Sequence, residues 1–272
     1  FKHSFSASAS ISPDLLKFFY IIGIRVSEGY GSTESFNACS NMPLLACRPG
    51  SIGLASNGSR LRVSEIGELE ISGAGVFKRY WNKPEETAES FTADGWFKTG
   101  DKVEVDKYGY YKIVDRIKNI ICLATGKNVA PAKVESKFAT SPYIDQVFPI
   151  GDERAVISTL LVPNFNYFKE KFDSEGVEYD KSQVVIDNSA GAPLVVKVGP
   201  DFIEKGNIRE LIAEEVKKAN SDLEGFEQIK QYTILSERFT EANEMLTPTQ
   251  KTKKRIILEK YAPVIDNMYS LK

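Results

Sequence analysis

The sequence predicts a mixed fold in which a β-rich first part is followed by a smaller α/β domain. Between residues 52 and 114, short alternating runs are separated by Gly, Asn, Pro and Asp, a pattern typical of a small β barrel or β sandwich. From about Asp115, apolar residues at helical spacing alternate with strand-like apolar runs, which indicates helices interleaved with strands. We therefore expect two domains, residues 1–115 and 116–272.

The beginning of the chain is expected to form a helix, a short strand and a turn. Ser12 offers a capping hydroxyl and Pro13 suits the first helical turn, while the helix should end near Gly23. Residues 24–28 alternate as in a strand. The segment GYGSTE, residues 29–34, would then lie on a turn after that strand.

The second part is expected to contain two helices and three strands. Pro131 opens a helix that carries Val134 and Phe138. The other expected elements are strands at 146–150, 155–162 and 229–235 and a helix at 207–220, which places Ile208, Leu211, Ile212 and Val216 on one face. We interpret residues 173–200 as an insertion.

Composition fits an ordinary folded protein of 272 residues, with 42% apolar and 26% charged residues. A net charge of -2 and a pI near 5.8 give no general attraction for nucleic acid, which we exclude as a partner. The longest apolar stretches, residues 18–24 and 155–162, are shorter than the roughly 20 residues that span a bilayer. Peripheral association of a longer protein with the inner membrane face stays open.

Cysteine and histidine usage excludes other classes of site. Cys39, Cys47 and Cys122 are scattered and odd in number, which fits a reducing interior and predicts a cytoplasmic location. The single histidine, His3, lies in a serine-rich start, so we expect a surface position and neither a His-dependent triad nor a His-built zinc site. Because the chain begins with Phe1, we expect it to belong to a longer protein.

GYGSTE has the residue types of a nucleotide site. Glycines such as Gly31 let backbone amides approach a phosphate, Thr33 can donate a hydrogen bond to it, and Glu34 can hold Mg²⁺. Tyr30 offers a flat face for a purine. The segment lacks the spacing and the lysine of a Walker loop, and by itself it is better explained as an ordinary tight turn.

Three further segments add polar groups. TGD, residues 99–101, is expected to form a turn, in which Asp101 can accept two hydrogen bonds from ribose hydroxyls; the alternative is an ordinary turn without a ligand. In DRIK, residues 115–118, Arg116 and Lys118 offer cations at the expected domain junction, or simply a solvated charge run. LTPTQKTKKR, residues 246–255, is by itself best explained as a basic amphipathic helix with a solvated face, and the other possibility is a small nucleic-acid or anion patch.

The order and approximate spacing of these segments resemble the acyl-CoA synthetase branch of the adenylate-forming superfamily. The matching segments are GYGSTE, GELEISGAGVFKRYWNKPEETAESF at 67–91, DGWFKTGD at 94–101, DRIKNIICLATGKNVAP at 115–131 and LTPTQKTKKR. GKNVAP and the threonine-proline-threonine lead-in to Lys251 are similar to long-chain fatty acyl-CoA synthetases. The resemblance implies that residues 1–115 end the large domain with a β-barrel-like subdomain, and that residues 116–272 form a small C-terminal α/β lid domain.

The resemblance implies an activity with ATP, Mg²⁺ and coenzyme A, in which a fatty acid is adenylated and then transferred to the thiol. Tyr30 would stack on adenine, while Gly31 and Thr33 would contact phosphate. Glu34 would hold the metal. The ribose would be bound by Asp101 with help from Arg116, and the catalytic Lys251 would bridge the carboxylate and the α-phosphate.

The resemblance also implies domain alternation. Lys118 occupies the hinge about which the lid swings. One pose brings Lys251 to the acyl-adenylate. The other brings a loop at 120–128, which lines the pantetheine route and in which Gly126 lets the backbone pass close to the ligand.

Several features depart from the family pattern. Residues 6–13, SASASISP, replace a glycine-rich turn that ends in Ala-Pro, and Arg79 and Thr125 occupy common glycine positions. No segment resembles the Ser/Thr/Gly-rich phosphate loop, so we expect an inactive fragment of a ligase. The alternatives are a fatty acyl-AMP ligase, a ligase for another carboxylic acid, and a non-catalytic nucleotide- or partner-binding module. Chain length of the acid and oligomeric state stay open.

Overall fold

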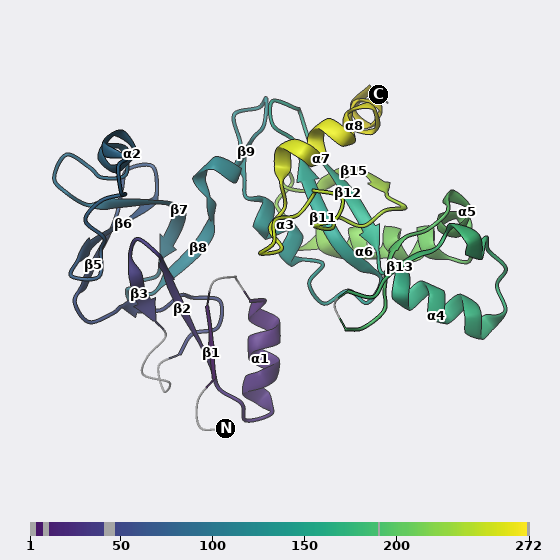
Figure 1. The fold of residues 1–272 in the computed structure, drawn as a ribbon, viewed down its shortest axis with the longest axis horizontal. Coiled ribbons are helices and arrows are strands. Elements are labelled where there is room, and N and C mark those ends of the chain that lie inside the picture. Colours follow the sequence, from purple (N-terminus) through teal and green to yellow (C-terminus); the bar gives the residue numbers. More distant parts are fainter. Residues whose placement is uncertain (1–3, 8–10, 41–46, 190, 271–272) are drawn as a thin grey trace. The chain divides into compact units, whose positions relative to one another are not determined.

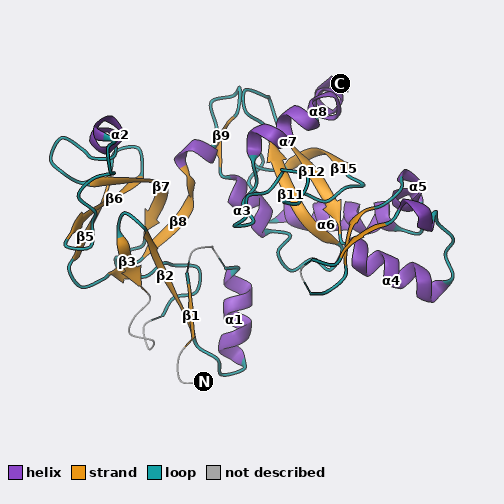
Figure 2. Ribbon diagram, viewed as in Figure 1, coloured by secondary structure: helices purple, strands orange, loops and turns teal. Residues whose placement is uncertain are grey.

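The computed structural model describes residues 4–7, 11–40, 47–189 and 191–270 (Figures 1 and 2). The chain divides into two compact units, residues 1–120 and 121–272. The expected boundary at 115/116 stays a prediction about functional domains. His3 and the middle of the SASASISP segment lie outside the described residues.

Two sheets organise the described part of the first unit. One has the order β1-β2-β3-β4, in which β1 and β2 are parallel and the other pairs antiparallel. The other is an antiparallel meander with the order β5-β6-β7-β8. The strands are β1 Ser4–Ser6, β2 Val26–Ser32, β3 Phe36–Ser40, β4 Leu54–Ala55, β5 Ser59–Val63, β6 Glu68–Gly73, β7 Phe97–Val105 and β8 Tyr111–Arg116. The β-rich character of residues 52–114 is confirmed, whereas closure into a barrel stays a prediction.

Short helical segments complete this unit. They are α1 Pro13–Ile21, α2 Pro84–Glu89 and the 3-10 turn η2 Ile117–Asn119. Helix α1 begins at Pro13 as expected, but the Ser12 side chain makes no capping hydrogen bond. Gly23 follows the helix with φ +84°, a conformation that glycine adopts at little cost.

Two motif segments lie in strands rather than in turns. Gly29–Ser32 belongs to β2, and the turn of that hairpin is confined to residues 33–35. Residues 99–101 lie inside β7, where the register against β6 shifts between Glu68 and Glu70. Glycine, threonine and aspartate at these places therefore form irregularities in paired strands. The prediction of a turn was wrong for Gly29–Ser32 and for residues 99–101, because sequence alone does not reveal the pairing partner, but Thr33 and Glu34 do lie in a turn.

The second unit is an α/β assembly around a three-stranded sheet with the order β11-β12-β15 (Figure 1). Strand β12 pairs antiparallel with β11 and parallel with β15, and all seven of its residues are buried. The strands are β9 Ile121–Cys122, β10 Asn128–Val129, β11 Ile144–Ile150, β12 Ile157–Pro163, β13 Val185–Asp187, β14 Leu194–Lys197 and β15 Ile229–Ile234. The helical segments are α3 Pro131–Ser136, α4 Phe165–Glu175, η3 Lys181–Gln183, α5 Pro200–Glu204, α6 Ile208–Ser221, α7 Lys254–Lys260 and α8 Ala262–Ser270.

The expected strands and helices of this part are confirmed to within a few residues, and Ile208, Ile212 and Val216 of α6 are buried as predicted. The stretch interpreted as an insertion forms the β13-β14 hairpin and supplies Tyr179 and Val195 to the core. It is therefore part of the packed unit.

Within the part of the chain that the structure describes, no helix combines the length and the apolar character needed to cross a bilayer.

We expect replacement of Phe168 by alanine to lower the free energy of unfolding by about 3–5 kcal/mol, because it would leave a large cavity. Phe168 is 0% exposed and its ring contacts those of Tyr143, Tyr167 and Phe172. Urea titration of the 272-residue chain measures this. Val185, which is 48% exposed, gives a matched control whose replacement by alanine should cost less than about 0.5 kcal/mol. Equal losses for the two variants would contradict this assignment of the core.

Candidate active site

In the first unit, three of the predicted site residues are in direct contact. The Tyr30 hydroxyl donates a hydrogen bond to Asp101 Oδ2 over 2.5 Å, and Arg116 Nε lies 3.1 Å from Asp101 Oδ1. Asp101 itself is 7% exposed, whereas the Arg116 side chain is 62% exposed. A buried carboxylate is thus held between a phenol and a guanidinium that faces solvent.

The backbone irregularity in β7 places Asp101. Gly100 has φ +72°, and its amide donates to Glu68 Oε1 over 2.7 Å. The Thr99 hydroxyl donates to the Leu69 carbonyl over 2.7 Å and accepts a hydrogen bond from the Asp101 amide over 3.1 Å. Side chains of β6 and β7 therefore fix the bulge, and the bulge fixes the direction of the carboxylate.

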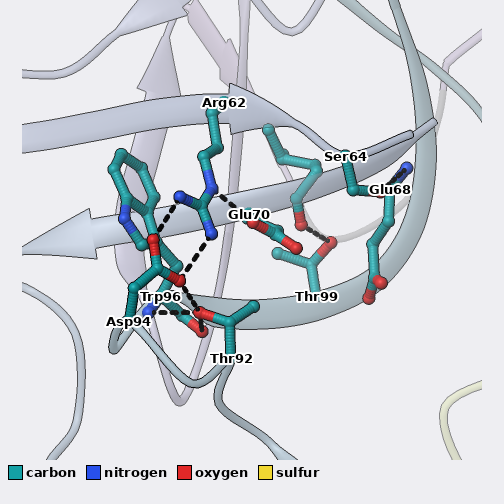
Figure 3. A network of polar contacts seen from close by, with 9 residues as sticks. Arg62, Ser64, Glu68, Glu70, Thr92, Asp94, Trp96 and Thr99 are labelled. Atoms are coloured by element: carbon teal, nitrogen blue, oxygen red, sulfur yellow. Dashed lines mark hydrogen bonds and ion pairs between the residues drawn. The ribbon is translucent and has the colours of Figure 1, made fainter. Parts of the chain in front are cut away.

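Polar contacts also tie the neighbouring strands together, as Figure 3 shows. Arg62 of β5 bonds to Glu70 of β6 over 2.5 Å and to both carboxylate oxygens of Asp94 over 2.6 and 2.9 Å. The guanidinium also lies 4.5 Å from the centre of the Trp96 ring. This network compensates the buried Glu70 carboxylate and stabilises the sheet that carries Asp101.

Glu34 remains ionised in this arrangement. The Tyr80 hydroxyl donates to Glu34 Oε1 over 2.8 Å. Desolvation by itself raises the pKa of Glu34. Hydrogen bonds from Ser32 and Tyr80 together with the positive charge of Arg116 lower it, and the resulting pKa lies below its ordinary value. Arg116 therefore acts on both carboxylates predicted for the site, Glu34 and Asp101.

Burial and the nearby Asp101 charge raise the pKa of Tyr30 well above its ordinary range. The phenol is therefore protonated, as a donor to a carboxylate requires. The ring packs against the first unit's core, which includes Leu69 and Phe97.

Gly31 is required by the hairpin itself. A Cβ at this position would lie 1.4 Å from the carbonyl oxygen of Phe36 in the facing strand, so any residue other than glycine would clash with that backbone. Gly31 and Thr33 are exposed, so the tip of the hairpin presents backbone and hydroxyl groups to solvent.

Lys118 lies in η2, at the end of the first unit, and its side chain is exposed. Asp115 Oδ1 accepts hydrogen bonds from the Arg116 amide over 2.7 Å and from Asn119 Nδ2 over 3.4 Å. This buried carboxylate fixes the turn that carries Lys118 and at the same time orients the backbone of Arg116.

The second unit carries Gly126 and Lys251. Gly126 lies in the turn of the β9-β10 hairpin with φ +76°, and its amide donates to the Leu123 carbonyl over 2.8 Å. Lys251 closes a turn in which its amide donates to the Thr247 hydroxyl over 3.0 Å. Its side chain is exposed, and among the described residues its ammonium forms no ion pair.

The structure brings together Tyr30, Glu34, Asp101 and Arg116 within the first unit, while Gly126 and Lys251 belong to the second. The sequence reasoning missed the groups that orient these residues, namely Tyr80, Glu68 and Asp115. Asp115 stood in a segment already singled out, but nothing in the sequence signalled that Tyr80 would reach Glu34.

Comparisons with known proteins bear on the family and the fold of the chain. Residues 118–190 match the family model described as "AMP-binding enzyme C-terminal domain". The adenylation domain of a carboxylate reductase from Mycobacterium chelonae superposes with a TM-score of 0.72 at 23% identity, covering 98% of this chain and 38% of that one. ATP-bound MatB from Rhodopseudomonas palustris superposes with a TM-score of 0.65 at 24% identity, covering 94% of this chain and 45% of that one.

The chain belongs to the adenylate-forming, or AMP-binding, superfamily, as its motifs predicted. Within that superfamily its sequence is similar to long-chain-fatty-acid–CoA ligase FadD15 of Mycobacterium bovis, at 35% identity over 266 residues. That match covers 97% of this chain and 41% of the relative, so the chain spans less than half of the relative's length.

The buried Glu28 predicts a pH dependence of stability. Desolvation raises its pKa from 4.5 to about 7, although the Gly50 amide donates to it over 3.0 Å. Because the folded-state pKa is raised, its stabilising contribution is complete below about pH 4.5 and is lost as pH rises to about 7. We expect this contribution to fall by about 2–3 kcal/mol in that window.

Chemical denaturation of the 272-residue chain at a series of pH values measures the effect, and the Glu28→Gln variant isolates it. The variant should lose that part of the pH dependence. An unchanged pH profile in the variant would show that Glu28 is not the group responsible.

Proposed function

We propose that the protein to which this chain belongs joins a long-chain fatty acid to coenzyme A at the expense of ATP. The observation that carries the proposal is the cluster of Tyr30, Asp101, Arg116 and Glu34, which offers an aromatic face, a diol acceptor and a metal-binding carboxylate beside one another. The similarity to a relative named as a long-chain-fatty-acid–CoA ligase supports the choice of substrates.

In the first step, a carboxylate oxygen of the acid attacks the α-phosphorus of ATP. The bond to this oxygen forms while the α–β phosphoanhydride breaks, and pyrophosphate leaves. Tyr30 would face the adenine, and Asp101 with Arg116 would hold the ribose hydroxyls. Lys251 would neutralise the negative charge that develops between the acid and the α-phosphate, which is electrostatic stabilisation of the transition state.

Magnesium would be held by Glu34 together with the phosphates of ATP. Among the described residues, no group of three or more His, Cys, Asp or Glu side chains is placed to hold a metal. A single ionised carboxylate nevertheless fits Mg²⁺, which usually combines one or two carboxylates with water and substrate phosphates. The ion would neutralise phosphate charge, and the lowered pKa of Glu34 keeps its side chain available for that role.

In the second step, the thiol of coenzyme A attacks the acyl carbon. A carbon–sulfur bond forms, the bond to the phosphate oxygen breaks, AMP leaves and the thiol proton passes to solvent. Lys118 would be the hinge for the change of pose between the steps, and the residues after it would act as a lid. The hairpin around Gly126 would line the pantetheine route, with Thr33 and Gly31 contacting phosphate in the first step.

The alternatives are an acyl-AMP ligase that does not use coenzyme A, a ligase for another acid, and a binding module without catalysis. A module would need neither the exposed Lys251 nor the ionised Glu34. A cytoplasmic location, with peripheral contact between the whole protein and a membrane, remains part of the proposal.

Replacement of Lys251 by alanine in the full-length protein should slow adenylation about 10²–10³-fold, because one preorganised cation is lost from the transition state. Pyrophosphate release with palmitate, ATP and Mg²⁺ measures this step. The Lys253→Ala variant is the matched control, since it removes a lysine two positions away in the same basic segment. Equal rates for Lys251→Ala and wild type would argue for a different chemistry or none.

We expect the 272-residue chain by itself to release no detectable pyrophosphate in the same assay, because no segment of its sequence resembles the phosphate loop. Turnover by this chain would contradict the assignment of an essential role to that loop.

A further inference from the structure

In the second unit, the turn at residues 151–154 contacts both segments to which the proposed function assigns chemistry. This turn joins β11 to β12. On one side it meets the β9-β10 hairpin, and on the other it meets the start of α7, three residues after Lys251.

Three hydrogen bonds attach the hairpin to the turn. The Cys122 amide donates to Asp152 Oδ1 over 2.9 Å, and the Glu153 amide donates to the Cys122 carbonyl over 2.9 Å. The Ala124 amide donates to the Arg154 carbonyl over 2.9 Å. The outer edge of β9 is thereby hydrogen-bonded to the turn, and the acceptor for the Cys122 amide is the side chain of Asp152.

Close packing makes the turn and the hairpin one body. A Cβ on Gly151 would lie 2.8 Å from Ile157 Cδ1 and 3.1 Å from side-chain carbons of Ile121 and Leu123. A larger residue at this position would force these side chains to shift, and the side chains of Ile121 and Leu123 are themselves buried.

The same carboxylate reaches the lysine-bearing segment. Lys254 Nζ, on the first residue of α7, lies 3.2 Å from Asp152 Oδ2. Arg154 adds a second connection through its ion pair with Asp266 of α8 over 2.9 Å. The two oxygens of Asp152 are therefore divided between the hairpin and the segment that follows Lys251.

We propose that Asp152 is a positioning residue for both half-reactions, since it holds the pantetheine-lining hairpin through Cys122 and the Lys251 segment through Lys254. This inference rests on the proposed function. The lid then moves as one body, and a single carboxylate sets the distance between the parts that serve adenylation and thioester formation.

We expect Asp152 to affect the placement of the hairpin and of the Lys251 segment more than the stability of the folded protein. Its side chain is 53% exposed and that of Lys254 is 36% exposed, and exposed ion pairs contribute little to the free energy of folding. Misplacing a reacting group by about 1 Å can nevertheless cost on the order of 10²-fold in rate. The effect of a substitution should therefore appear in the rates while the melting temperature stays unchanged.

The test measures the two half-reactions separately in the full-length protein. Pyrophosphate release in the absence of coenzyme A reports adenylation, and single-turnover reaction of purified acyl-AMP with coenzyme A reports thioester formation. Asp152→Ala should slow both steps by about 10-fold or more. Asp152→Asn keeps an acceptor for the Cys122 amide, so it should slow adenylation alone, as should Lys254→Ala.

Glu259→Gln is the matched control, because it breaks the 3.2 Å ion pair with Arg255 on the same helix without touching the turn. The inference is overturned if the wild-type protein is active in both steps and Asp152→Ala has the same rate as Glu259→Gln in each of them. That result would leave the ligase assignment unaffected. Wild-type protein that forms no acyl-adenylate would overturn the proposed function itself. If Asp152→Ala fails to fold, the adenylation rates of Asp152→Asn and Lys254→Ala test the inference instead. Wild-type adenylation rates in both of these variants would overturn it.

Discussion

The first unit depends on the buried carboxylate of Asp101. A charge with 7% exposure needs partners, and it has the Tyr30 hydroxyl and the Arg116 guanidinium. These partners come from β2 and β8, which are far apart in sequence, so one charge joins three strands at the site. Any diol that binds there must add to these contacts or replace them, which makes Arg116, exposed and shared with Glu34, the most adaptable of the three.

The second unit is organised around its buried central strand and the turn that leads into it. Its buried central strand, β12, provides the rigid support, and the turn that leads into that strand contacts both the hairpin and α7. In the proposed function this unit acts as a lid that presents two different segments at one place, and that role needs the two segments fixed relative to each other. Attachment of both to the turn at the start of the fully buried strand β12 satisfies that requirement.

Much of the fold could be predicted because burial leaves a period in the sequence. The spacing of Ile208, Ile212 and Val216 predicted α6, and the apolar run before Val162 predicted β12. Within GYGSTE the turn assignment failed for Gly29–Ser32, and it failed for TGD, since Gly31 and Gly100 serve bulges whose partners, Phe36 and Glu68, are set by strand pairing. Glycine near polar residues has the same appearance in a turn and in a bulge.

The sequence by itself determined the superfamily, the order of the chemical groups and the helical and strand periods, because these are properties of residue type and spacing. Tertiary structure alone decided that Tyr80 bonds to Glu34, that Tyr30 donates to Asp101, and that Asp152 divides its oxygens between Cys122 and Lys254. Such contacts join residues that are distant along the chain. Their geometry depends on how sheets and turns approach one another, which no local pattern encodes.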